Sequence, residues 1–450
     1  FFPPPPPPPP DPLWSRGLGD VYKRQRGMND ILPKNSLSWQ YLESTFRRVV
    51  KRFGYQEIRF PVLEHTQLFK RSIGEVTDIV EKEMYSFDDR NGDNLSLRPE
   101  GTAGCVRAAD QHGLLYNQQQ RLWYQGPMFR HERQQKGRYR QFHQFGVEAF
   151  GMPGPDIDVE VLQVAVMLWQ ELDLSDYLTL ELTNIGSAVD RMNFGLALTE
   201  YLQTKEDQLD DDARNRMHTN PMRVLDSKNP DVQAALIDVP SLEDFVSAES
   251  KQHYAELQDL LNSASINFIE NPRLVRGLDY YNNCVLEWTT DTLGAQGAVC
   301  GGGRYDGLVA QLGGRDVLAC GFAIGVERLI LMLDSLEKIP QDALQPIDIY
   351  VTCIGQNVTE QTLDLAQAIR ESQPQLGVIS HCGGGKFNSQ LKRAFNSGAK
   401  IAVILERDDD GESILESAKI RRLDDSAETT SHKITEIPQK VAEFLKNSAS

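Results

Sequence analysis

The chain has 450 residues, of which 47 are Lys or Arg and 64 are Asp or Glu, so its formal net charge is −17. This length is typical of about three domains, and 40% hydrophobic residues are enough to bury a core. The chain contains no run of about 18 apolar residues, so no membrane span is predicted. The negative charge argues against indiscriminate nucleic-acid binding, but it leaves room for a local basic site that binds phosphate.

Six cysteines are scattered along the chain without a CxxC pair, which argues against a zinc site and against a disulfide framework. They are typical of reduced, buried thiols in a cytosolic protein. The first 25 residues contain eight consecutive prolines and no helical or strand period. The segment VYKRQ resembles translated adapter sequence more than protein. We therefore interpret residues 1–25 as a non-native or disordered lead.

The first predicted element is a helix over residues 36–55, because its apolar residues recur at helical spacing until Gly54. Residues 55–69 alternate as in a strand, and Pro61 places that strand at an edge or a kink. Residues 94–113 predict a strand, a Pro-Gly turn, and then a helix that starts near Thr102.

A polar, mainly helical insertion is expected over residues 185–265. Strands and glycine turns return at 274–288 and 297–314, and a strand, Gly325 and a helix follow at 319–336. After a linker near 337–346, strands alternate with helices as in a compact α/β domain. The predicted domains are 26–184 with 266–340, 185–265, and 346–450.

A long antiparallel hairpin is predicted by two strand patterns, 121–132 and 141–150, around the polar loop RQQKGRYR. Strand alternation puts one set of residues of the second strand on a common face: Phe142, Gln144, Gly146, Glu148 and Phe150. An aromatic ring can stack on a base, and an arginine can donate two hydrogen bonds to a phosphate. Amide and carboxylate oxygens can accept hydrogen bonds from an ammonium group, and a glycine lets a ligand approach the backbone. An ordinary exposed hairpin with Phe142 and Phe150 in the core has equal weight.

Other polar residues are weaker signals when taken alone. Arg328 falls in the first turn of the last predicted helix, where backbone amides favour anions, but a solvated charge fits equally well. Arg276 lies close to Asp279, so a structural ion pair is its simplest interpretation. The glycine-rich segments 300–307 and 382–387 fit neither GxGxxG nor P-loop spacing, and turns explain them better.

Taken together, these segments resemble the class II aminoacyl-tRNA synthetases, and specifically the bacterial histidyl-tRNA synthetases, from about Arg26 to the C-terminus. FPVLE is similar to motif 1 of that family, GPMFRHERQQKGRYRQFHQFGVE to motif 2 and GFAIGVERL to motif 3. RPEGT and LVRGLDYY are similar to the two stretches that mark the histidine enzymes.

The resemblance implies an α+β catalytic domain built on a six-stranded antiparallel sheet, a helical insertion, and a C-terminal α/β anticodon-binding domain. It also implies a two-step reaction in the cytoplasm. L-Histidine and ATP, with Mg²⁺, give histidyl-adenylate and pyrophosphate, and the histidyl group then moves to the 3′ end of histidine tRNA. A homodimer is expected through motif 1, although the same helix could simply pack within its own chain. No protein ligand to a metal is predicted.

The resemblance further assigns roles to individual residues. Arg130 and Arg276 would be catalytic, and Arg276 would bridge the substrate carboxylate and the α-phosphate. ATP would be bound by Arg130, Glu132, Arg138, Phe142 and Arg328. Histidine would be bound by Glu100, Gly101, Thr102, Arg130, Gln144, Glu148, Arg276, Tyr280 and Tyr281. Three basic residues of the last domain are candidates for tRNA contact, with surface solvation as the simpler interpretation: Lys386, Lys392 and Arg393.

Two alternatives remain. One is a synthetase-like regulatory protein that binds histidine without activating it. The phosphate-binding arginines and the C-terminal α/β region both disfavour that reading. The other is a synthetase for a different amino acid, which LVRGLDYY disfavours.

Overall fold

The computed structural model describes residues 24–446 except 76, 136, 228, 273, 275–276, 295–296, 356–357, 407–415 and 425–427. Most of the predicted lead and the predicted catalytic residue Arg276 therefore lie outside the described residues. The chain divides into two compact units, residues 1–31 with 42–338 and residues 32–41 with 339–450. The predicted domain boundaries stay a prediction.

The first unit is built on an eight-stranded sheet with the order β1-β5-β6-β11-β10-β9-β7-β8. Its six central strands all pair antiparallel, as the resemblance implies, and the two-residue edge strands β1 and β8 pair parallel. The strands are β1 (Gln56–Glu57), β5 (Gln120–Phe129), β6 (Gln141–Phe150), β7 (Thr179–Asn184), β8 (Ile269–Glu270), β9 (Asn282–Thr289), β10 (Ala298–Arg304) and β11 (Ala319–Gly325).

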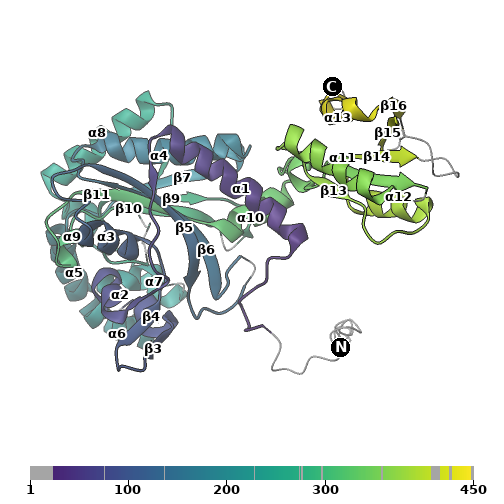
Figure 1. The fold of residues 1–450 in the computed structure, drawn as a ribbon. Helices are drawn as coiled ribbons and strands as arrows, with labels where there is room; N and C mark the ends of the chain where they lie inside the picture. The colour runs from purple at the N-terminus through teal and green to yellow at the C-terminus, as the bar shows by residue number, and fades with distance from the viewer. Residues whose placement is uncertain are drawn as a thin grey trace, which may run out of the picture. The chain divides into compact units, whose positions relative to one another are not determined.

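Helices cover both faces of this sheet (Figure 1). One face carries the C-terminal part of α1 (Pro33–Arg52), α4 (Pro155–Glu171) and α8 (Ala248–Ser263). On the other face, α3 (Thr102–Gln111) and α9 (Leu308–Gln311) pack into the core that also contains Leu122, Tyr124 and Val285. Helix α10 (Val326–Ser335) follows β11 directly. The candidate site lies on the α3 side.

The predicted N-terminal helix is confirmed as α1. Leu42, Phe46, Val49 and Val50 are fully buried, and the Phe46 ring stacks on Phe145 of β6 at 4.2 Å between centroids. Gly54 ends the helix with φ +75°, a left-handed conformation that favours glycine. This apolar face is thus already used within the chain.

The predicted strand over 55–69 is wrong in its extent. The segment contains β1, then β2 (Leu63–His65), and then helix α2 (Thr66–Ile73). Pro61 interrupts the pairing because proline has no N–H to donate to a ladder. Thr66, Phe69 and Ile73 are buried at helical spacing, and that period is the signal the alternating pattern concealed.

A three-stranded sheet, β2-β4-β3, precedes α3 and contains β3 (Ser86–Asp88) and β4 (Asn94–Leu97). The π-helical segment η3 (Ile79–Glu83) lies before β3. The predicted strand, turn and helix over 94–113 are confirmed, and α3 begins at Thr102 as expected.

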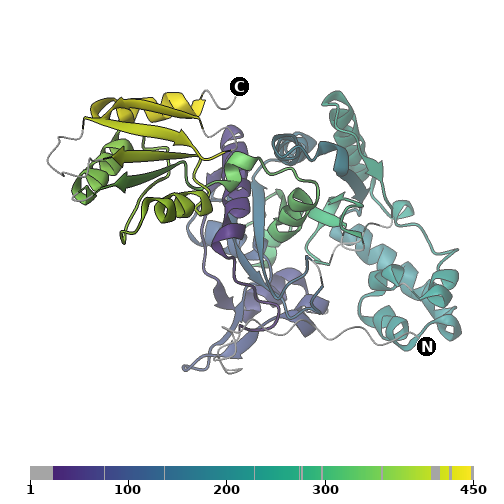
Figure 2. The ribbon, with the colours of Figure 1, turned by 90° about the vertical axis from the view of Figure 1, so that its right-hand side faces the viewer.

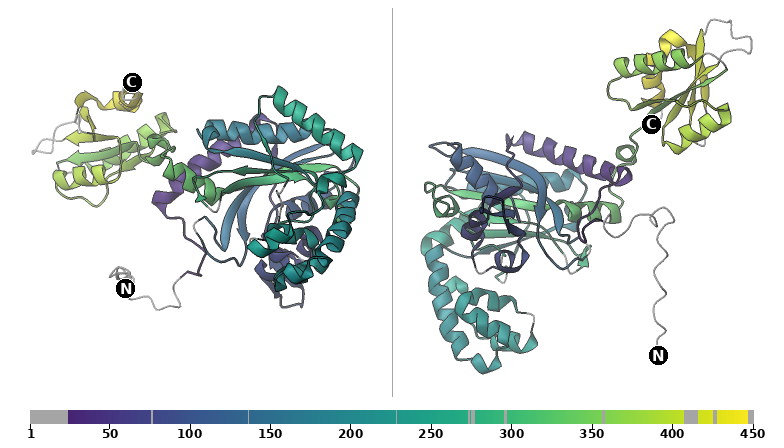
Figure 3. Two further views of the ribbon diagram at one scale, coloured as in Figure 1. Left: turned by 180° about the vertical axis from the view of Figure 1, so that it is seen from behind. Right: turned by 60° about the horizontal axis from the view of Figure 1, so that its bottom comes forward.

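Helices α5 (Ala188–Gln203), α6 (Asp211–Thr219) and α7 (Pro230–Ala235) form a group with a core of its own around Phe194, Leu198 and Met217. Figures 2 and 3 show this group to one side of the large sheet, in teal. The helical character predicted between 185 and 265 is therefore present. The remaining short helices are η4 (Ser175–Tyr177), η5 (Glu206–Gln208), η6 (Pro221–Asp226), η7 (Leu242–Asp244), η9 (Gln341–Leu344) and η10 (Ile434–Glu436).

The second unit is a five-stranded sheet with the order β13-β12-β14-β15-β16. The first three strands are parallel and the last two are antiparallel additions. Its strands are β12 (Ile349–Ile354), β13 (Val378–Ser380), β14 (Ile401–Glu406), β15 (Ser417–Arg422) and β16 (Thr429–Lys433). Its helices are α11 (Thr359–Ser372), α12 (Phe387–Asn396) and α13 (Ile437–Lys446). The α/β pattern predicted from the sequence is present here.

Candidate active site

A cavity of about 160 Å³ opens on the α3 side of the sheet, over β6, β10 and β11. It is lined by residues from five separate stretches of the chain. Ten of the predicted site residues line it: Glu100, Thr102, Arg130, Glu132, Arg138, Phe142, Gln144, Tyr280, Tyr281 and Arg328. Gly101 and Glu148 lie behind this lining, and Arg276 is outside the described residues.

Three guanidinium groups converge at one end of the cavity. Burial lowers the pKa of Arg328, and the positive charges of Arg138 and Arg130 lower it further. Arg328 also donates from Nη1 to the Ala298 carbonyl. Because like charges gathered in a cleft raise the local potential, this end of the cavity favours a polyanion such as a nucleoside triphosphate.

Glu132 provides the carboxylate that partly balances these arginines. It is buried, forms an ion pair with Arg138, and lies 3.8 Å from Nη1 of Arg130. The predicted strand through Arg130 and Glu132 is too long, since β5 ends at Phe129. Both residues belong instead to the loop, where the Arg130 backbone N–H donates to the Arg140 carbonyl.

Phe142 presents an aromatic ring to the cavity next to this charged end. The guanidinium carbon of Arg130 lies 5.4 Å from the centre of the ring, and Nε of Arg130 donates to the Pro99 carbonyl at 2.8 Å. An aromatic face beside phosphate-binding arginines suits a purine nucleotide.

Glu100 is a buried carboxylate of the cavity lining, next to Pro99, whose carbonyl accepts from Arg130. Its carboxylate accepts hydrogen bonds from the backbone N–H groups of Thr102 at 2.6 Å and Ala103 at 2.9 Å, and so satisfies the first turn of α3. Burial raises its pKa, although these backbone hydrogen bonds act in the opposite direction. The Tyr280 and Tyr281 rings, 4.6 Å apart between centroids, line the cavity with it. A buried carboxyl group and tyrosine hydroxyls can pair both nitrogens of an imidazole.

Gln144 offers an acceptor that the protein itself does not use. Its Oε1 is buried and has no hydrogen-bond partner among the residues that the structure describes. Since buried polar atoms are almost always paired, this oxygen is available to an N–H donor of a ligand.

Glu148 is almost completely buried, with 1% of its surface exposed. Its Oε1 accepts from the hydroxyl of Thr102 at 2.8 Å and of Tyr124 at 3.2 Å, and its Oε2 accepts from the hydroxyl of Tyr305. Burial raises the pKa of Glu148 to about 8, against the effect of these hydrogen bonds. A carboxyl group that burial biases toward its neutral form therefore lies directly behind Thr102 of the lining.

The sequence-based explanation of Gly146 is wrong. A Cβ atom at Gly146 would lie 2.1 Å from the Tyr124 ring, and a Cβ at Gly101 would meet the same ring at the same distance. The two glycines thus make room for Tyr124, which fills the space that a ligand was expected to approach.

A larger cavity, of about 650 Å³, lies between the α5–α7 group and the sheet. It shares only Leu278 and Tyr281 with the smaller cavity and contains none of the predicted phosphate-binding arginines that the structure describes. The smaller cavity is therefore the candidate active site.

Comparison with known proteins agrees with this geometry. The family model described as histidyl-tRNA synthetase matches residues 27–329. The crystal structure of apo S. aureus histidyl-tRNA synthetase is 31% identical, with a TM-score of 0.77 and coverage of 93% of this chain and 99% of that chain. The chain belongs to the histidyl-tRNA synthetase family.

Two more distant structures share the fold. Histidyl-tRNA synthetase from Nostoc sp. PCC 7120 is 17% identical with a TM-score of 0.68, and the match covers 94% of this chain and 100% of that chain. A Bacillus halodurans protein titled as an ATP phosphoribosyltransferase regulatory subunit/histidyl-tRNA synthetase is 20% identical with a TM-score of 0.61. That match covers 87% of this chain and 100% of the other.

Members of this family use ATP, and the class II fold predicted from the sequence is confirmed. Across the described part of the chain, no group of three or more His, Cys, Asp or Glu side chains is placed to hold a metal ion. No helix in that part is both long and apolar enough to span a membrane. All six cysteines are described, and none forms a disulfide.

Two residues that support the synthetase site were missed in the sequence. The Glu327 carboxylate accepts from the His143 backbone N–H at 2.9 Å and contacts Nδ1 of the same residue at 2.9 Å, so it fastens the start of α10 to β6. Arg98 is buried and donates to the carbonyls of Pro127 and Phe60. Arg98 lies in RPEGT and Glu327 lies in GFAIGVERL, so both belong to segments that the sequence singled out. Their hydrogen-bond partners are distant in sequence, and strand alternation alone could not reveal them.

Proposed function

We propose that this member of the family is a histidine–tRNA ligase whose chemistry takes place in the 160 Å³ cavity. It activates L-histidine with ATP to histidyl-adenylate and pyrophosphate, and then transfers histidine to the 3′ end of histidine tRNA. The observation that carries the proposal is that Arg130, Arg138 and Arg328 line one cavity together with Glu100 and Tyr281.

The arginine end would hold ATP. Arg130 would bind the α-phosphate, Arg328 the γ-phosphate, and Arg138 the β- and γ-phosphates. Phe142 would stack on adenine. Glu132 would face the adenine amino group, and its ion pair with Arg138 would then have to loosen when the triphosphate arrives. Guanidinium groups suit this task because they stay charged and bind phosphate oxygens in pairs.

The part of the lining around Glu100 would hold histidine. Glu100 and Tyr281 would pair the two imidazole nitrogens, with Thr102 and Tyr280 beside them. The unpartnered Oε1 of Gln144 supports a contact with the α-ammonium group. The family resemblance assigns Glu148 to the same group, and Gly101 would shape the pocket through Tyr124. An analogue without the polar ring atoms would leave buried groups unpaired and would be rejected.

Activation requires the histidine carboxylate to attack the α-phosphorus while pyrophosphate leaves, so two anions must meet. Fixed positive charge aimed at the reacting phosphate makes this approach favourable and stabilises the charge that develops. Arg130 would supply that charge from the hairpin loop. Arg276 would bridge the carboxylate and the α-phosphate; this assignment rests on the family resemblance.

Mg²⁺ would enter with ATP rather than occupy a protein cage. Two carboxylates of the lining lie near the phosphate-binding side chains: Glu132, which is paired with Arg138, and Glu327, which accepts from the His143 backbone N–H. This donor set fits a magnesium ion that keeps water and phosphate oxygens as most of its ligands. When bound, the ion would neutralise charge on the β- and γ-phosphates.

The remaining parts of the proposal concern partners and compartment. The C-terminal unit would bind the anticodon, and Lys386, Lys392 and Arg393 are exposed on or just before α12. The protein would act as a homodimer through the motif 1 region, where Leu63 of β2 is partly exposed. Six thiols without a disulfide favour a reducing compartment such as the cytoplasm.

ATP–pyrophosphate exchange with each of the twenty amino acids tests the function directly. We expect exchange with histidine alone, followed by charging of histidine tRNA. Histidine binding without exchange would instead support a regulatory protein. Exchange with another amino acid would identify a synthetase for that amino acid. Either result would refute the proposal.

A further inference from the structure

The larger cavity, of about 650 Å³, has no role in the proposed function beyond the one residue Tyr281. Its size is that of a pocket which encloses a small organic molecule. It shares Leu278 and Tyr281 with the candidate active site, and the rest of its lining is its own. The chemistry of that lining indicates which kind of molecule it can hold.

Most of the lining is apolar, and the apolar side chains come from both sides of the cavity. Phe194 of α5, Met222 of η6 and Leu236 after α7 belong to the helical group. Leu274 and Val285 face them from the sheet side. Because apolar surface is removed from water when a ligand enters such a cavity, these walls favour the apolar body of a ligand.

The charges of the lining are unequal. It contains two guanidinium groups, Arg191 of α5 and Arg223 of η6, and one carboxylate, Asp279. Nη1 of Arg191 is buried and has no hydrogen-bond partner among the residues that the structure describes. Burial lowers the pKa of Arg191, and the charges of Asp279 and Asp190 act in the opposite direction. Since buried polar groups are almost always paired, this guanidinium lacks an acceptor.

The two carboxylates that influence Arg191 are engaged in other contacts. Asp190 accepts from the backbone N–H of Ser187 at 2.8 Å and completes the capping box of α5. Burial raises the pKa of Asp279, whereas Arg223, Arg191 and a hydrogen bond from Asn220 lower it. A Cβ atom at Gly74 would collide with the Asp279 carboxylate, so this group packs against bare backbone. An acceptor for Nη1 therefore has to come from a bound molecule.

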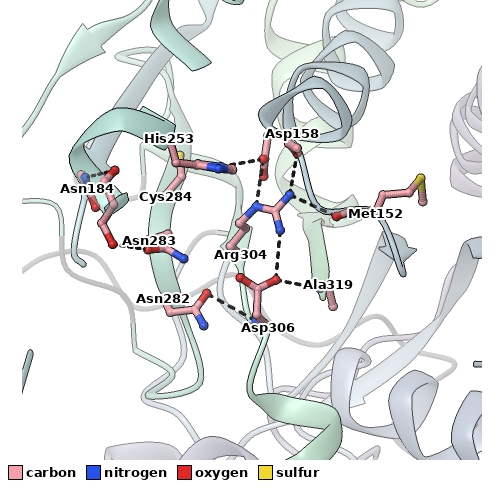
Figure 4. Close-up of polar contacts among 12 residues, drawn as sticks. Met152, Asp158, Asn184, His253, Asn282, Asn283, Cys284, Arg304, Asp306 and Ala319 are labelled. Carbon is pink, nitrogen blue, oxygen red and sulfur yellow. Dashed lines mark hydrogen bonds and ion pairs between the residues drawn. The ribbon is translucent and has the colours of Figure 1, made fainter. Parts of the chain in front are cut away.

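The sheet side of the cavity is fixed by hydrogen bonds to α8 (Figure 4). Ile185 of the lining donates its backbone N–H to the Asn283 carbonyl at 2.7 Å. The Asn184 side chain donates to the Ser250 carbonyl at 2.9 Å, and the Ser250 hydroxyl donates to Oδ1 of Asn283 at 2.7 Å. The end of β7 and the start of β9 are thus joined to one helix.

Arg304 holds the next strand, β10, in a similar way (Figure 4). Its side chain is 2% exposed and donates to Asp158 of α4 at 2.9 Å and to Asp306 at 3.0 Å. Asp158 also contacts Nε2 of His253 on α8 at 3.2 Å. Strand β10 pairs with β9, which carries Val285 of the lining. The sheet side of the cavity is therefore held by contacts that do not involve an occupant.

We propose that the 650 Å³ cavity is a binding site for an organic carboxylate with an apolar body. The carboxylate accepts hydrogen bonds from Arg191 and Arg223, and the body lies between the α5–α7 group and the sheet. A carboxylate suits this place because its two oxygens match the fork of a guanidinium group.

The test is calorimetric titration of the full-length protein with octanoate, without histidine, ATP or tRNA. We expect one saturable site. Octanamide has the same chain length and no charge, and it should bind at least about tenfold more weakly because hydrogen bonds to a charged group are lost. Inorganic phosphate has the charge and no apolar body, so it should not displace octanoate.

Two variants test the guanidinium groups separately. Arg191→Met and Arg223→Met should each weaken octanoate binding about tenfold or more, and urea unfolding shows whether each variant is folded. Arg328→Met is the control for location, because Arg328 lines the smaller cavity and does not line the larger one. It should leave octanoate binding unchanged.

Several results would overturn the inference. These are no saturable binding of octanoate at millimolar concentrations, equal affinity for octanamide, and undiminished binding to either folded arginine variant. Loss of octanoate binding in Arg328→Met would place the probe in the smaller cavity and would overturn it as well. Because the titration contains no substrate of the proposed reaction, its failure would leave the exchange assay, and with it the proposed function, unaffected.

Discussion

Arg328→Met separates the catalytic importance of the arginine cluster from its effect on stability. In the folded protein Arg328 donates to the Ala298 and Gly137 carbonyls, and each such hydrogen bond contributes about 0.5–1.5 kcal/mol. Against this, the substitution removes a buried charge that faces Arg130 and Arg138. The lowered pKa of Arg328 shows that its surroundings disfavour the charged form, so removal of the charge offsets part of this loss.

The two effects on stability therefore oppose each other, and we expect the free energy of unfolding to change by no more than about 1–2 kcal/mol. Catalysis has no such compensation. The loss of one preorganised donor to a charged transition state costs about 2.7–4 kcal/mol, which is about 100- to 1000-fold in rate. We expect kcat/KM for ATP in pyrophosphate exchange to fall by this factor while the urea unfolding midpoint stays close to that of the unmodified protein.

Arg315→Met is the matched control, because Arg315 is exposed and its guanidinium lies over the Tyr116 ring, away from the cavity. It should leave exchange unchanged. A fall of less than about tenfold in Arg328→Met, with folding intact, would show that the converging arginines do not serve the reacting phosphates.

Three further predictions concern other parts of the molecule. Phe46→Ala should lower the free energy of unfolding by about 3–5 kcal/mol in urea titration, because the ring is fully buried on the sheet. Arg304→Met should destabilise the protein by about 3–5 kcal/mol at neutral pH and less in acid, because Asp306, whose pKa burial already raises, can then fold as the neutral acid. Lys392→Glu should reduce kcat/KM for tRNA several-fold and weaken its salt dependence, with unchanged pyrophosphate exchange.

Each of these has a contrary outcome. Equal unfolding midpoints for Phe46→Ala and the unmodified protein would mean that α1 does not depend on this ring. Destabilisation by Arg304→Met that grows as the pH falls would contradict the sign argued for the buried carboxylates. A parallel loss of exchange and charging in Lys392→Glu would point to misfolding instead of a tRNA contact.

Local patterns were sufficient to predict most of the fold. The amphipathic spacing of apolar residues predicted helix α1. The Pro-Gly turn predicted that α3 begins near Thr102, where the structure has it. Two alternating runs predicted the β5–β6 hairpin and the face that Phe142 and Gln144 share. These features depend on neighbours in sequence, and so they could be inferred from short segments.

The remainder depends on partners that are distant in sequence. Nothing near Gly146 in the chain indicates that the Tyr124 ring fills the space beside it, and nothing near Glu148 indicates a hydroxyl donor at Tyr305. The helix α2 was missed because its few apolar residues also fit a strand period. The packing of side chains from different strands and helices decides where these residues lie, and that packing exists only in the assembled sheet.

The order of strands in the sheet has a consequence for synthesis on the ribosome. Strand β11 lies between β6 and β10, so the hairpin made early in translation has no neighbour on that side until residues 319–325 emerge. During this interval a long unpaired edge is exposed, and such edges invite pairing with other chains. The nascent first unit is therefore expected to depend on chaperone protection until β11 and α10, its last elements in chain order, have left the exit tunnel. The candidate active site can be completed only at that point, because Gly325 and Arg328 line it.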